Sequence, residues 1–356
     1  MKQLHVFSTA GFTPVFTQLL RRFNCYNSCE IIQLRRDSYL GKVAILDEQG
    51  GERAGGAPNL YAYDKVVVHF LSPTVCEWIV RHPKVSFTWV LYGADLYSNP
   101  LVPVSFLLPA SADFEKKNPI EFLRRTAYKV LKSKDWNAAL LQVGTLLTSS
   151  KAEYDQVKSM INIPNARWGK FYYGKALIDY AAVETRSSRD GPLKMMLGNN
   201  ATSSLNHADF LLSQPDNPNQ VQWHIPLSYG STRYSSWLQA QVGHRKDVVL
   251  HLEHRPFDAY TEWLSGLHGA VFHNIRPQGL ANLHSLVMMG KAVFLHEKNS
   301  LRDHYVQSGL FLPCTKDFMA LKPQVALAQP WSGNKIALQS FWNIEDCMAN
   351  YQEHFS

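Results

Sequence analysis

The sequence predicts an α/β fold made of two Rossmann-like domains, and three observations support this prediction. Short apolar runs typical of strands alternate with amphipathic segments typical of helices along most of the chain. A polar stretch at residues 184–192 separates two such series. The chain also has 356 residues, which is more than one hydrophobic core usually serves.

The first series predicts a domain over residues 1–184. Its strands are expected at Leu4–Phe7, Val66–Leu71 and Phe87–Leu91, and its helices at Phe16–Phe23 and Val75–Val80. Strands that alternate with helices in this way pair in parallel, because each helix carries the chain back across the sheet. We therefore expect a parallel sheet in this domain.

The second series predicts a domain over residues 192–335, followed by helices at 336–356 that could cross back to the first domain. Its strands are expected at Leu193–Leu197, Val221–Pro226, Val248–Leu252, Ala270–His273 and after Gly290, and its helices at Ser235–Val242, Phe257–Leu264 and Leu280–Met289. Two consecutive units of this kind describe the GT-B architecture, in which two Rossmann-like domains have a cleft between them. One long doubly wound sheet is the alternative and is less expected at this length.

Composition narrows the class of partner. The net charge of +7 permits an acidic partner, which could be nucleic acid, a nucleotide or an anionic membrane surface. Basic residues are dispersed and no nucleic-acid reader motif occurs, so nucleic acid is not expected. No apolar run approaches about 20 residues, and the N-terminus reads as a strand, so we expect a cytoplasmic protein without a membrane span.

Neither a metal nor a cofactor is expected. The five cysteines are scattered and lack paired C-x-x-C spacing, which favours reduced, packed thiols over a disulfide framework or a zinc site. No Asp-x-Asp triplet occurs in the chain, and its absence argues against a metal-dependent enzyme of the GT-A type.

The stretch Asn274–Leu286 carries the strongest functional signal. It follows a predicted strand and reads as a polar loop that enters a helix, with Arg276, Gln278 and Gly279 at the junction and Asn282 in the first helical turn. Orphan N–H groups and the helix dipole at such a junction favour an anion. A guanidinium offers paired donors to phosphate, and a Gln amide can read a sugar hydroxyl or a base edge. A surface ion pair is the alternative role for Arg276.

A second junction follows the strand Leu193–Leu197. Gly198 allows the chain to approach a diphosphate closely, and four polar residues could supply donors: Asn199, Asn200, Ser204 and His207. Ordinary helix capping explains these residue types equally well.

Two further residues follow strands of the second domain. Tyr229 could pack on a sugar or a base, although a turn tyrosine at the rim of a core is the equal alternative. Glu253 ends the strand Val248–Leu252, at a position that commonly faces the nucleotide in GT-B folds.

In the first domain, Gly93, Asp95 and Tyr97 follow the strand Phe87–Leu91 and are candidates for the acceptor side of a cleft. A carboxylate near an acceptor hydroxyl could act as general base, whereas a lone Asp after a strand is otherwise an N-cap or an Asx-turn. Gly11, in the loop after the first strand, is a further candidate for acceptor contact or simply permits a turn.

Several of these blocks together resemble the family of TDP-4-acetamido-4,6-dideoxygalactose (Fuc4NAc):lipid II transferases. They are Tyr92–Tyr97, Leu197–Asn200 with Ser204 and His207, Phe257–Tyr260 and Asn274–Leu286. That family adds the third sugar of a lipid-linked repeat unit in the assembly of enterobacterial common antigen. The blocks recur in the family's order and cover most of the chain.

The resemblance implies a metal-independent GT-B glycosyltransferase that moves an amino-deoxysugar from a TDP-sugar to a polyprenyl-diphosphate-linked saccharide. It implies that Arg276 stabilises the departing diphosphate and that Asp95 orients or deprotonates the acceptor hydroxyl. It also implies a peripheral location on the inner face of the bacterial inner membrane. The alternatives are another nucleotide sugar, a protein acceptor or, from another class, a basic nucleic-acid-binding protein.

The segment Ile120–Lys134 has apolar residues at helical spacing and five basic side chains around them. Such a helix could dock on the protein's own core, or rest on anionic lipid with its basic side chains at head-group level. We expect a combination of the two, because a polyprenyl-linked acceptor brings the enzyme to a membrane.

Overall fold

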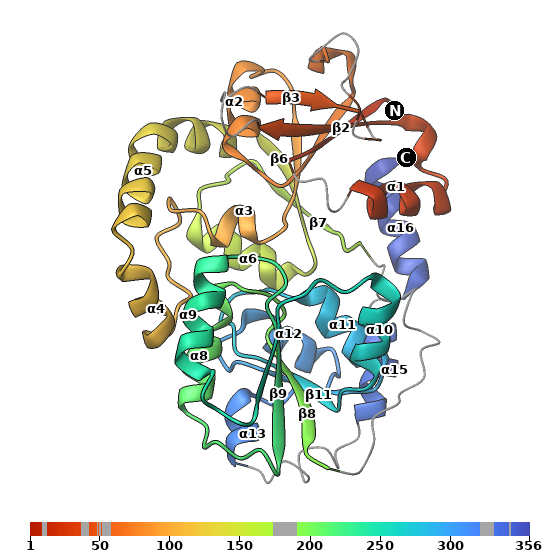
Figure 1. Ribbon diagram of the computed structural model, residues 1–356. Coiled ribbons are helices and arrows are strands. Elements are labelled where there is room, and N and C mark those ends of the chain that lie inside the picture. The colour runs from red at the N-terminus through yellow and green to blue at the C-terminus, as the bar shows by residue number, and fades with distance from the viewer. Residues whose placement is uncertain are drawn as a thin grey trace. The chain divides into compact units, whose positions relative to one another are not determined.

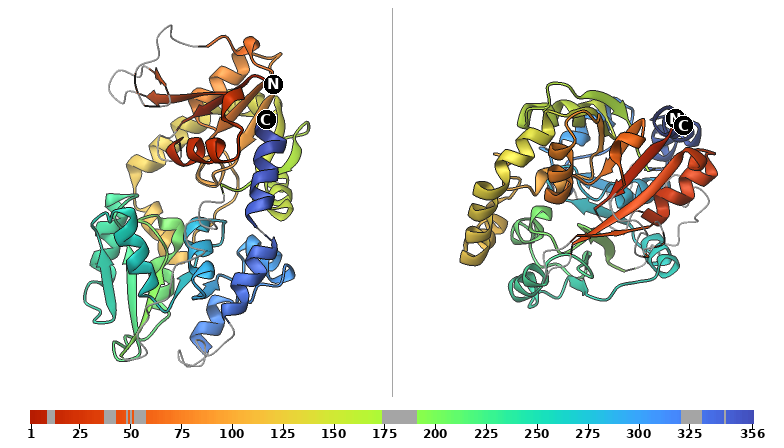
Figure 2. Two further views of the ribbon diagram at one scale, coloured as in Figure 1. Left: turned by 90° about the vertical axis from the view of Figure 1, so that its right-hand side faces the viewer. Right: turned by 90° about the horizontal axis from the view of Figure 1, so that it is seen from above.

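The computed structural model describes residues 1–8, 13–36, 43–47, 49, 51, 58–173, 191–320, 331–341 and 343–356. The chain divides into two compact units, each built round its own β-sheet (Figures 1 and 2). Unit 1 contains Met1–Val104, Leu123–Lys175 and Ile344–Ser356, and unit 2 contains Ser105–Phe122 and Ala176–Asn343. Most of the expected linker, 184–190, lies outside the described residues.

The sheet of unit 1 has seven strands in the order β3-β2-β1-β4-β5-β6-β7. The strands are β1 (Gln3–Phe7), β2 (Cys29–Arg36), β3 (Val43–Leu46), β4 (Lys65–His69), β5 (Phe87–Val90), β6 (Val143–Thr148) and β7 (Arg167–Lys170). All neighbours are parallel except β2 and β3, which pair in the antiparallel direction at the edge. Val66, Val67 and Val68 of β4 are all buried, as expected for a strand covered on both faces.

In sequence order, the helices of unit 1 come between its strands, except α16, which comes at the end of the chain. They are α1 (Thr13–Arg22), α2 (Pro73–Arg81), α3 (Ala94–Tyr97), α6 (Lys151–Met160), α16 (Ile344–Phe355) and most of α5 (Pro119–Leu140). The start of α2 follows from local chemistry, because Ser72 accepts a hydrogen bond from the Val75 N–H and Pro73 occupies the first turn.

The sheet of unit 2 has five parallel strands in the order β10-β9-β8-β11-β12. The strands are β8 (Leu193–Leu197), β9 (Val221–Pro226), β10 (Val248–His251), β11 (Gly269–Phe272) and β12 (Ala292–Leu295). The helices are α4 (Pro109–Lys116), α8 (His207–Leu212), α9 (Thr232–Val242), α10 (Phe257–Ser265), α11 (Leu280–Met288), α12 (Ser300–Gln307), α13 (Thr315–Ala320) and α15 (Trp331–Phe341).

Helix α4 is part of unit 2 because its apolar side packs there. The Phe114 ring lies 5.2 Å from the ring of Tyr234 and 4.7 Å from that of Trp237, both on α9. Asp209 of α8 accepts hydrogen bonds from the Ala110 and Ser111 backbone N–H groups, which satisfies donors at the start of α4.

Both sheets have a strand at which the order of the chain reverses. In unit 1 the chain runs from β1 to β2 and returns to β4 on the other side of β1; in unit 2 it runs outward from β8 and returns to β11. Ligands of open α/β sheets bind beyond the carboxyl ends of the strands at such a switch point. The fold therefore directs attention to the loops after β1 and β4, and after β8 and β11.

The α/β fold class predicted from the sequence is confirmed. The strand expected at Leu4–Phe7 is β1, the one at Leu193–Leu197 is β8, and the helix expected at Leu280–Met289 is α11. Among the described residues, no helix combines the length and the apolar character needed to cross a membrane.

Candidate functional site

The loops after β8, β9 and β11 bring five of the predicted side chains together within unit 2. A chain of hydrogen bonds joins Arg276, Ser204 and Gln278, and another joins Asn199 and Tyr229. All five residues follow the carboxyl ends of adjacent strands, at the switch point of the sheet.

Arg276 is the only permanently charged member of this group. Its side chain is 4% exposed, and its Nε and one terminal nitrogen donate to Ser204 Oγ at 3.2 and 3.0 Å. Ser204 Oγ in turn donates to Gln278 Oε1 at 2.8 Å. The Asn274 and Asn299 amides donate to the Arg276 carbonyl at 2.7 and 3.4 Å, so the loop is held from both sides.

Asn199 contributes an acceptor that no described residue uses. Its Nδ2 donates to the Tyr229 hydroxyl at 3.0 Å, whereas its Oδ1 is buried and has no hydrogen-bond partner among the described residues. A buried polar atom without a partner costs about 1–3 kcal/mol. This oxygen faces Gly279, since a Cβ built there would lie 3.0 Å from it.

Two glycines allow these close approaches. Gly279 has φ of +74° and is the N-cap of α11, which is a conformation that favours glycine. Gly198 has φ of +63°, and a Cβ at this position would lie 2.3 Å from His207 Nε2. Replacing either glycine would therefore strain the loop and push its neighbours away.

His207 lies beneath the β8 loop instead of on its surface. The ring is buried, and its Nδ1 hydrogen bonds with the Tyr234 hydroxyl at 3.1 Å. Burial, together with the nearby His273, lowers the pKa of His207 to about 3, so the ring is neutral at pH 7. This placement favours support of the loop at Gly198 over direct contact with a ligand.

Asn200 borders the Arg276 group, because its side chain hydrogen bonds with the Tyr229 hydroxyl and also accepts from the Thr202 hydroxyl within its own turn. Asn282 and Glu253 have other surroundings. Asn282 Oδ1 accepts a hydrogen bond from the Tyr260 hydroxyl at 2.6 Å, which joins α11 to α10. Glu253 is exposed and follows β10, an edge strand that β9 separates from β8.

A pocket of about 520 Å³ in unit 2 is lined by none of the predicted site residues. Its walls combine apolar side chains of the α4 and α8 region with polar ones that follow β11 and β12, among them His273, His296 and Lys316. The Arg276 group differs from this pocket in holding a buried cation at the switch point, together with a buried acceptor that has no partner among the described residues.

In unit 1, Asp95 is buried and both of its carboxylate oxygens accept hydrogen bonds. Oδ2 accepts from the Trp89 Nε1 at 2.7 Å and from the Leu71 N–H at 3.1 Å, and Oδ1 accepts from the Tyr92 N–H at 3.2 Å. Burial raises the pKa of Asp95, although these donors oppose the rise. The contacts join the ends of β4 and β5, and they favour a positioning role for the carboxylate.

Gly93 and Tyr97, the two other candidates near Asp95 in the sequence, also have roles within the fold of unit 1. Gly93 has φ of +86° and is the N-cap of the short helix α3. Tyr97 is 6% exposed, and its hydroxyl donates to Gln156 Oε1 at 3.4 Å. Gly11 lies outside the described residues.

Sequence reasoning missed a chain of buried polar rings in unit 1. His5 Nδ1 and His69 Nε2 are 3.0 Å apart, His69 Nδ1 and the Tyr173 hydroxyl are 3.0 Å apart, and the Tyr173 hydroxyl donates to that of Tyr92. His5 and His69 are fully buried, and burial lowers the pKa of His5 to about 3. The sequence offers no spacing signal for this chain, since its members come from four distant segments.

Glu153 was also missed, because it matches an ordinary helix start. It stands three residues after Ser150, whose hydroxyl accepts a hydrogen bond from the Glu153 N–H at 3.2 Å. Its own carboxylate accepts from the Ser149 N–H and hydroxyl, and it is 5% exposed. Burial raises the pKa of Glu153 to about 7, within the range useful for acid–base chemistry.

Metal-ligating side chains do not gather within the described part of the chain. No group of three or more His, Cys, Asp or Glu residues there has the arrangement that could hold a metal ion. His224 of β9 and His251 of β10 form only a pair, with 2.9 Å between His224 Nδ1 and His251 Nε2. The other ring nitrogen of His251 contacts the Arg255 guanidinium.

Comparison with known proteins supports the fold but gives no family. No family model and no curated protein matches the sequence. Among solved structures, sucrose-phosphate synthase from Thermosynechococcus elongatus matches with a TM-score of 0.63 at 13% identity, over 99% of this chain and 98% of that chain. HepE from Anabaena in complex with UDP-glucose has a TM-score of 0.61 at 11% identity, over 99% of both chains.

A third match is the lipopolysaccharide outer core galactosyltransferase WaaB, with a TM-score of 0.58 at 11% identity over 99% of this chain and 98% of that chain. At such low identity the likeness speaks for the fold alone. Because it extends over the whole chain and both sheets, the protein has a fold of the GT-B type.

Proposed function

We propose that this protein is a glycosyltransferase that moves an amino-deoxysugar, Fuc4NAc or a close relative, from a TDP-sugar to a polyprenyl-diphosphate-linked saccharide. The observation that carries the proposal is the Arg276, Ser204 and Gln278 group beside the N-terminus of α11. The fold, which HepE uses to hold UDP-glucose, and the resemblance in sequence both support it.

The donor's diphosphate would occupy the switch point of unit 2. Backbone N–H groups at the start of α11 have no partner within the helix and favour negative charge. Arg276 adds a full positive charge, held in place by Ser204 before the ligand arrives. Asn199 Oδ1 would accept a hydrogen bond from a hydroxyl or amide of the donor.

Catalysis in this proposal comes mainly from stabilising the leaving group. As the bond between sugar and diphosphate breaks, negative charge grows on the phosphate oxygens. Donors already aimed at that position each contribute a few kcal/mol, because they need not reorganise during the reaction. Arg276 and the α11 N–H groups would supply this effect.

A UDP-sugar is the second candidate donor, and the HepE complex with UDP-glucose is the observation that favours it. A panel of nucleotide diphosphates decides between the two. TDP at ~100 times its dissociation constant should stabilise the fold by about 2.7 kcal/mol, and UDP or GDP at the same concentration should do so less. Equal thermal shifts with all three would remove the claim of thymidine specificity, and no shift with any of them would contradict a nucleotide site.

The same assay tests the residue that carries the proposal. Arg276→Gln should weaken TDP binding at least ~10-fold, because it removes a charge-assisted hydrogen bond to phosphate. Lys246→Gln is the matched control, since it removes one charge from an exposed side chain of unit 2 next to the amino end of β10. If both variants bind TDP like the parent, Arg276 has only a structural role.

A further inference from the structure

Helix α5 is drawn in yellow in Figure 1, and its buried side chains all lie near its C-terminal end. One side of the helix packs against unit 1 there. That side carries Tyr128, Lys132, Trp136 and Ala139, which follow one another every three or four residues. Trp136 and Ala139 are buried, and Lys132 pairs with Glu77 of α2. Side chains at this spacing lie above one another on a helix, so the packed face runs along the C-terminal part of α5, from Tyr128 onward.

The opposite side of α5 is apolar and exposed. Ile120, Leu123, Val130 and Leu131 are 76%, 66%, 75% and 71% exposed, and Ala127 lies between them and is also exposed. At 100° per residue these five side chains fall within one arc, turned away from the packed face. We call them the outer stripe. The protein's own core does not cover these side chains, so α5 docks on the core through its other side and leaves the outer stripe uncovered.

Basic side chains accompany the outer stripe. At 100° per residue, Lys134 falls within the stripe and Arg124 lies beside it, and both are exposed, whereas Arg125 and Lys129 fall toward the packed face. The acidic residues of the helix are only Glu121 and Asp135, and neither falls within the stripe. A helix with apolar side chains on one face and Lys and Arg around them binds at the boundary between head groups and acyl chains. The positive charge matches an anionic lipid surface, and the apolar stripe between the basic side chains matches the acyl chains beneath the head groups.

We infer that the outer stripe of α5 inserts into an anionic lipid surface and that Lys134 and Arg124 contact the head groups. The inference rests on the proposed function in one respect, since a polyprenyl-linked acceptor lies in such a surface. It adds the part of the molecule that makes the contact and the chemistry of the contact. Insertion of the leucine, isoleucine and valine side chains supplies the apolar component, and the basic side chains supply a salt-sensitive one.

Co-sedimentation with vesicles that contain no saccharide acceptor tests this inference. The parent should bind vesicles of phosphatidylglycerol and phosphatidylethanolamine and bind pure phosphatidylcholine at least ~10-fold more weakly, as expected when basic side chains near the surface contribute. Leu123→Gln with Leu131→Gln should reduce binding to the anionic vesicles at least ~10-fold, because two inserting side chains become polar. Arg124→Gln with Lys134→Gln should also reduce it and should lower its dependence on salt.

The matched control is Val306→Gln with Ile336→Gln, which changes two exposed apolar residues on α12 and α15 and should leave vesicle binding unchanged. If the α5 variants sediment like the parent, or the control loses binding equally, the inference is wrong. A parent that is dimeric by light scattering, and becomes monomeric with Leu123→Gln and Leu131→Gln, would instead assign the outer stripe to a second copy of the chain. The TDP shift should persist in every variant, so this test and that of the proposed function fail separately.

Discussion

At the scale of single residues, the site of unit 2 depends on a charge fixed in place before any ligand binds. The Arg276 side chain is buried, and Ser204 accepts from two of its nitrogens. A fixed guanidinium loses little conformational entropy on binding, which is why preorganised donors contribute more than mobile ones. Ser204 therefore acts on the ligand partly through Arg276.

The role of Asp95 can be tested directly, because a general base and a positioning residue respond differently to the same substitution. Its three donors favour a positioning role, whereas the sequence-based prediction of a general base stays open. In Asp95→Asn the side-chain NH₂ must face at least one backbone or indole N–H. Because a buried donor then loses its acceptor, we expect the free energy of unfolding to fall by about 1–3 kcal/mol.

Two measurements on Asp95→Asn separate the roles. For a positioning residue, chemical unfolding should show the loss of stability, and transfer by the folded fraction should fall less than ~100-fold. Unchanged stability with transfer slowed more than ~100-fold, and with TDP affinity intact, would identify a general base instead. Asp113→Asn serves as the control, because that carboxylate is exposed on α4.

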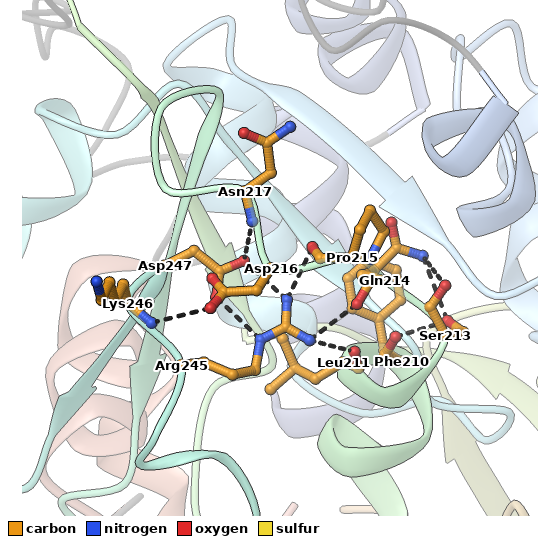
Figure 3. A network of polar contacts seen from close by, with 10 residues as sticks. All are labelled: Phe210, Leu211, Ser213, Gln214, Pro215, Asp216, Asn217, Arg245, Lys246 and Asp247. Carbon is orange, nitrogen blue, oxygen red and sulfur yellow. Dashed lines mark hydrogen bonds and ion pairs between the residues drawn. The ribbon is translucent and has the colours of Figure 1, made fainter.

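At the scale of elements, a buried ion pair in the turn before β10 also hydrogen bonds to the end of α8 and to the segment that leads to β9 (Figure 3). Arg245 donates to both Asp247 oxygens at 2.9 and 2.7 Å, and to the carbonyls of Leu211, Gln214 and Pro215. The Arg245 and Asp247 side chains are 9% and 1% exposed. Burial opposes ionisation of Asp247, but the bonds and charge of Arg245 hold its pKa below the usual range.

This pair predicts a pH-dependent contribution to stability. A carboxylate with a lowered pKa in the folded state stabilises fully above its unfolded pKa of about 3.9, and this contribution is lost as the pH falls through the folded value. Asp247→Asn should therefore lower the free energy of unfolding at pH 7 by about 3 kcal/mol, the scale for breaking a buried pair, and by much less near pH 2. Urea unfolding at both pH values measures the difference.

Asp303→Asn is the control for this pH dependence, because that side chain is 73% exposed on α12 and its pair with Arg302 lies at the surface. Surface pairs contribute about 0–1 kcal/mol, so the variant should unfold like the parent at either pH. A deficit of Asp247→Asn that is equal at pH 7 and near pH 2 would show that its charge is not the cause.

The elements that sequence predicts well are those with a strong apolar pattern. The run Val66–Val68 and the helix after Gly279 show their periods plainly and appear as β4 and α11. The strand β7 (Arg167–Lys170) has the sequence Arg-Trp-Gly-Lys, which shows neither an apolar run nor an apolar–polar alternation. Its first two side chains are exposed, so the core does not dictate their type. Its place at the sheet edge follows from pairing with β6, which no local pattern encodes.

The candidate site was predictable to the level of loops but not of contacts. Residues after β8 and β11 were expected to meet because parallel strands end at one edge of a sheet. Whether a side chain points into the site or under it depends on packing, as His207 beneath Gly198 and Asp95 beside Trp89 show. The chain from His5 to Tyr92 was not predictable, because it joins side chains far apart in the sequence.

At the scale of the whole molecule, the two units hold different buried ionisable groups near the carboxyl ends of their strands. Unit 2 holds the guanidinium of Arg276 at its switch point, whereas unit 1 holds the carboxyl groups of Asp95 after β5 and of Glu153 after β6. Both units also contain buried histidines with lowered pKa values. A GT-B enzyme needs positive potential where the donor's diphosphate departs and proton acceptors on the acceptor side. The division of groups between the units is consistent with that requirement.

The same division predicts that sugar transfer does not need a divalent metal. Arg276 and the N–H groups of α11 can neutralise the departing diphosphate, and the chain has no Asp-x-Asp pair of the kind that holds a metal on a nucleotide sugar. Initial rates of transfer from a TDP-sugar after treatment with EDTA should therefore stay within about twofold of the untreated rate, a change of less than ~0.5 kcal/mol in the barrier. Added magnesium or manganese should not raise them further. Complete loss of transfer in EDTA that either metal restores, with the thermal stability of the protein unchanged, would show that a metal ion and not Arg276 carries the charge of the leaving group.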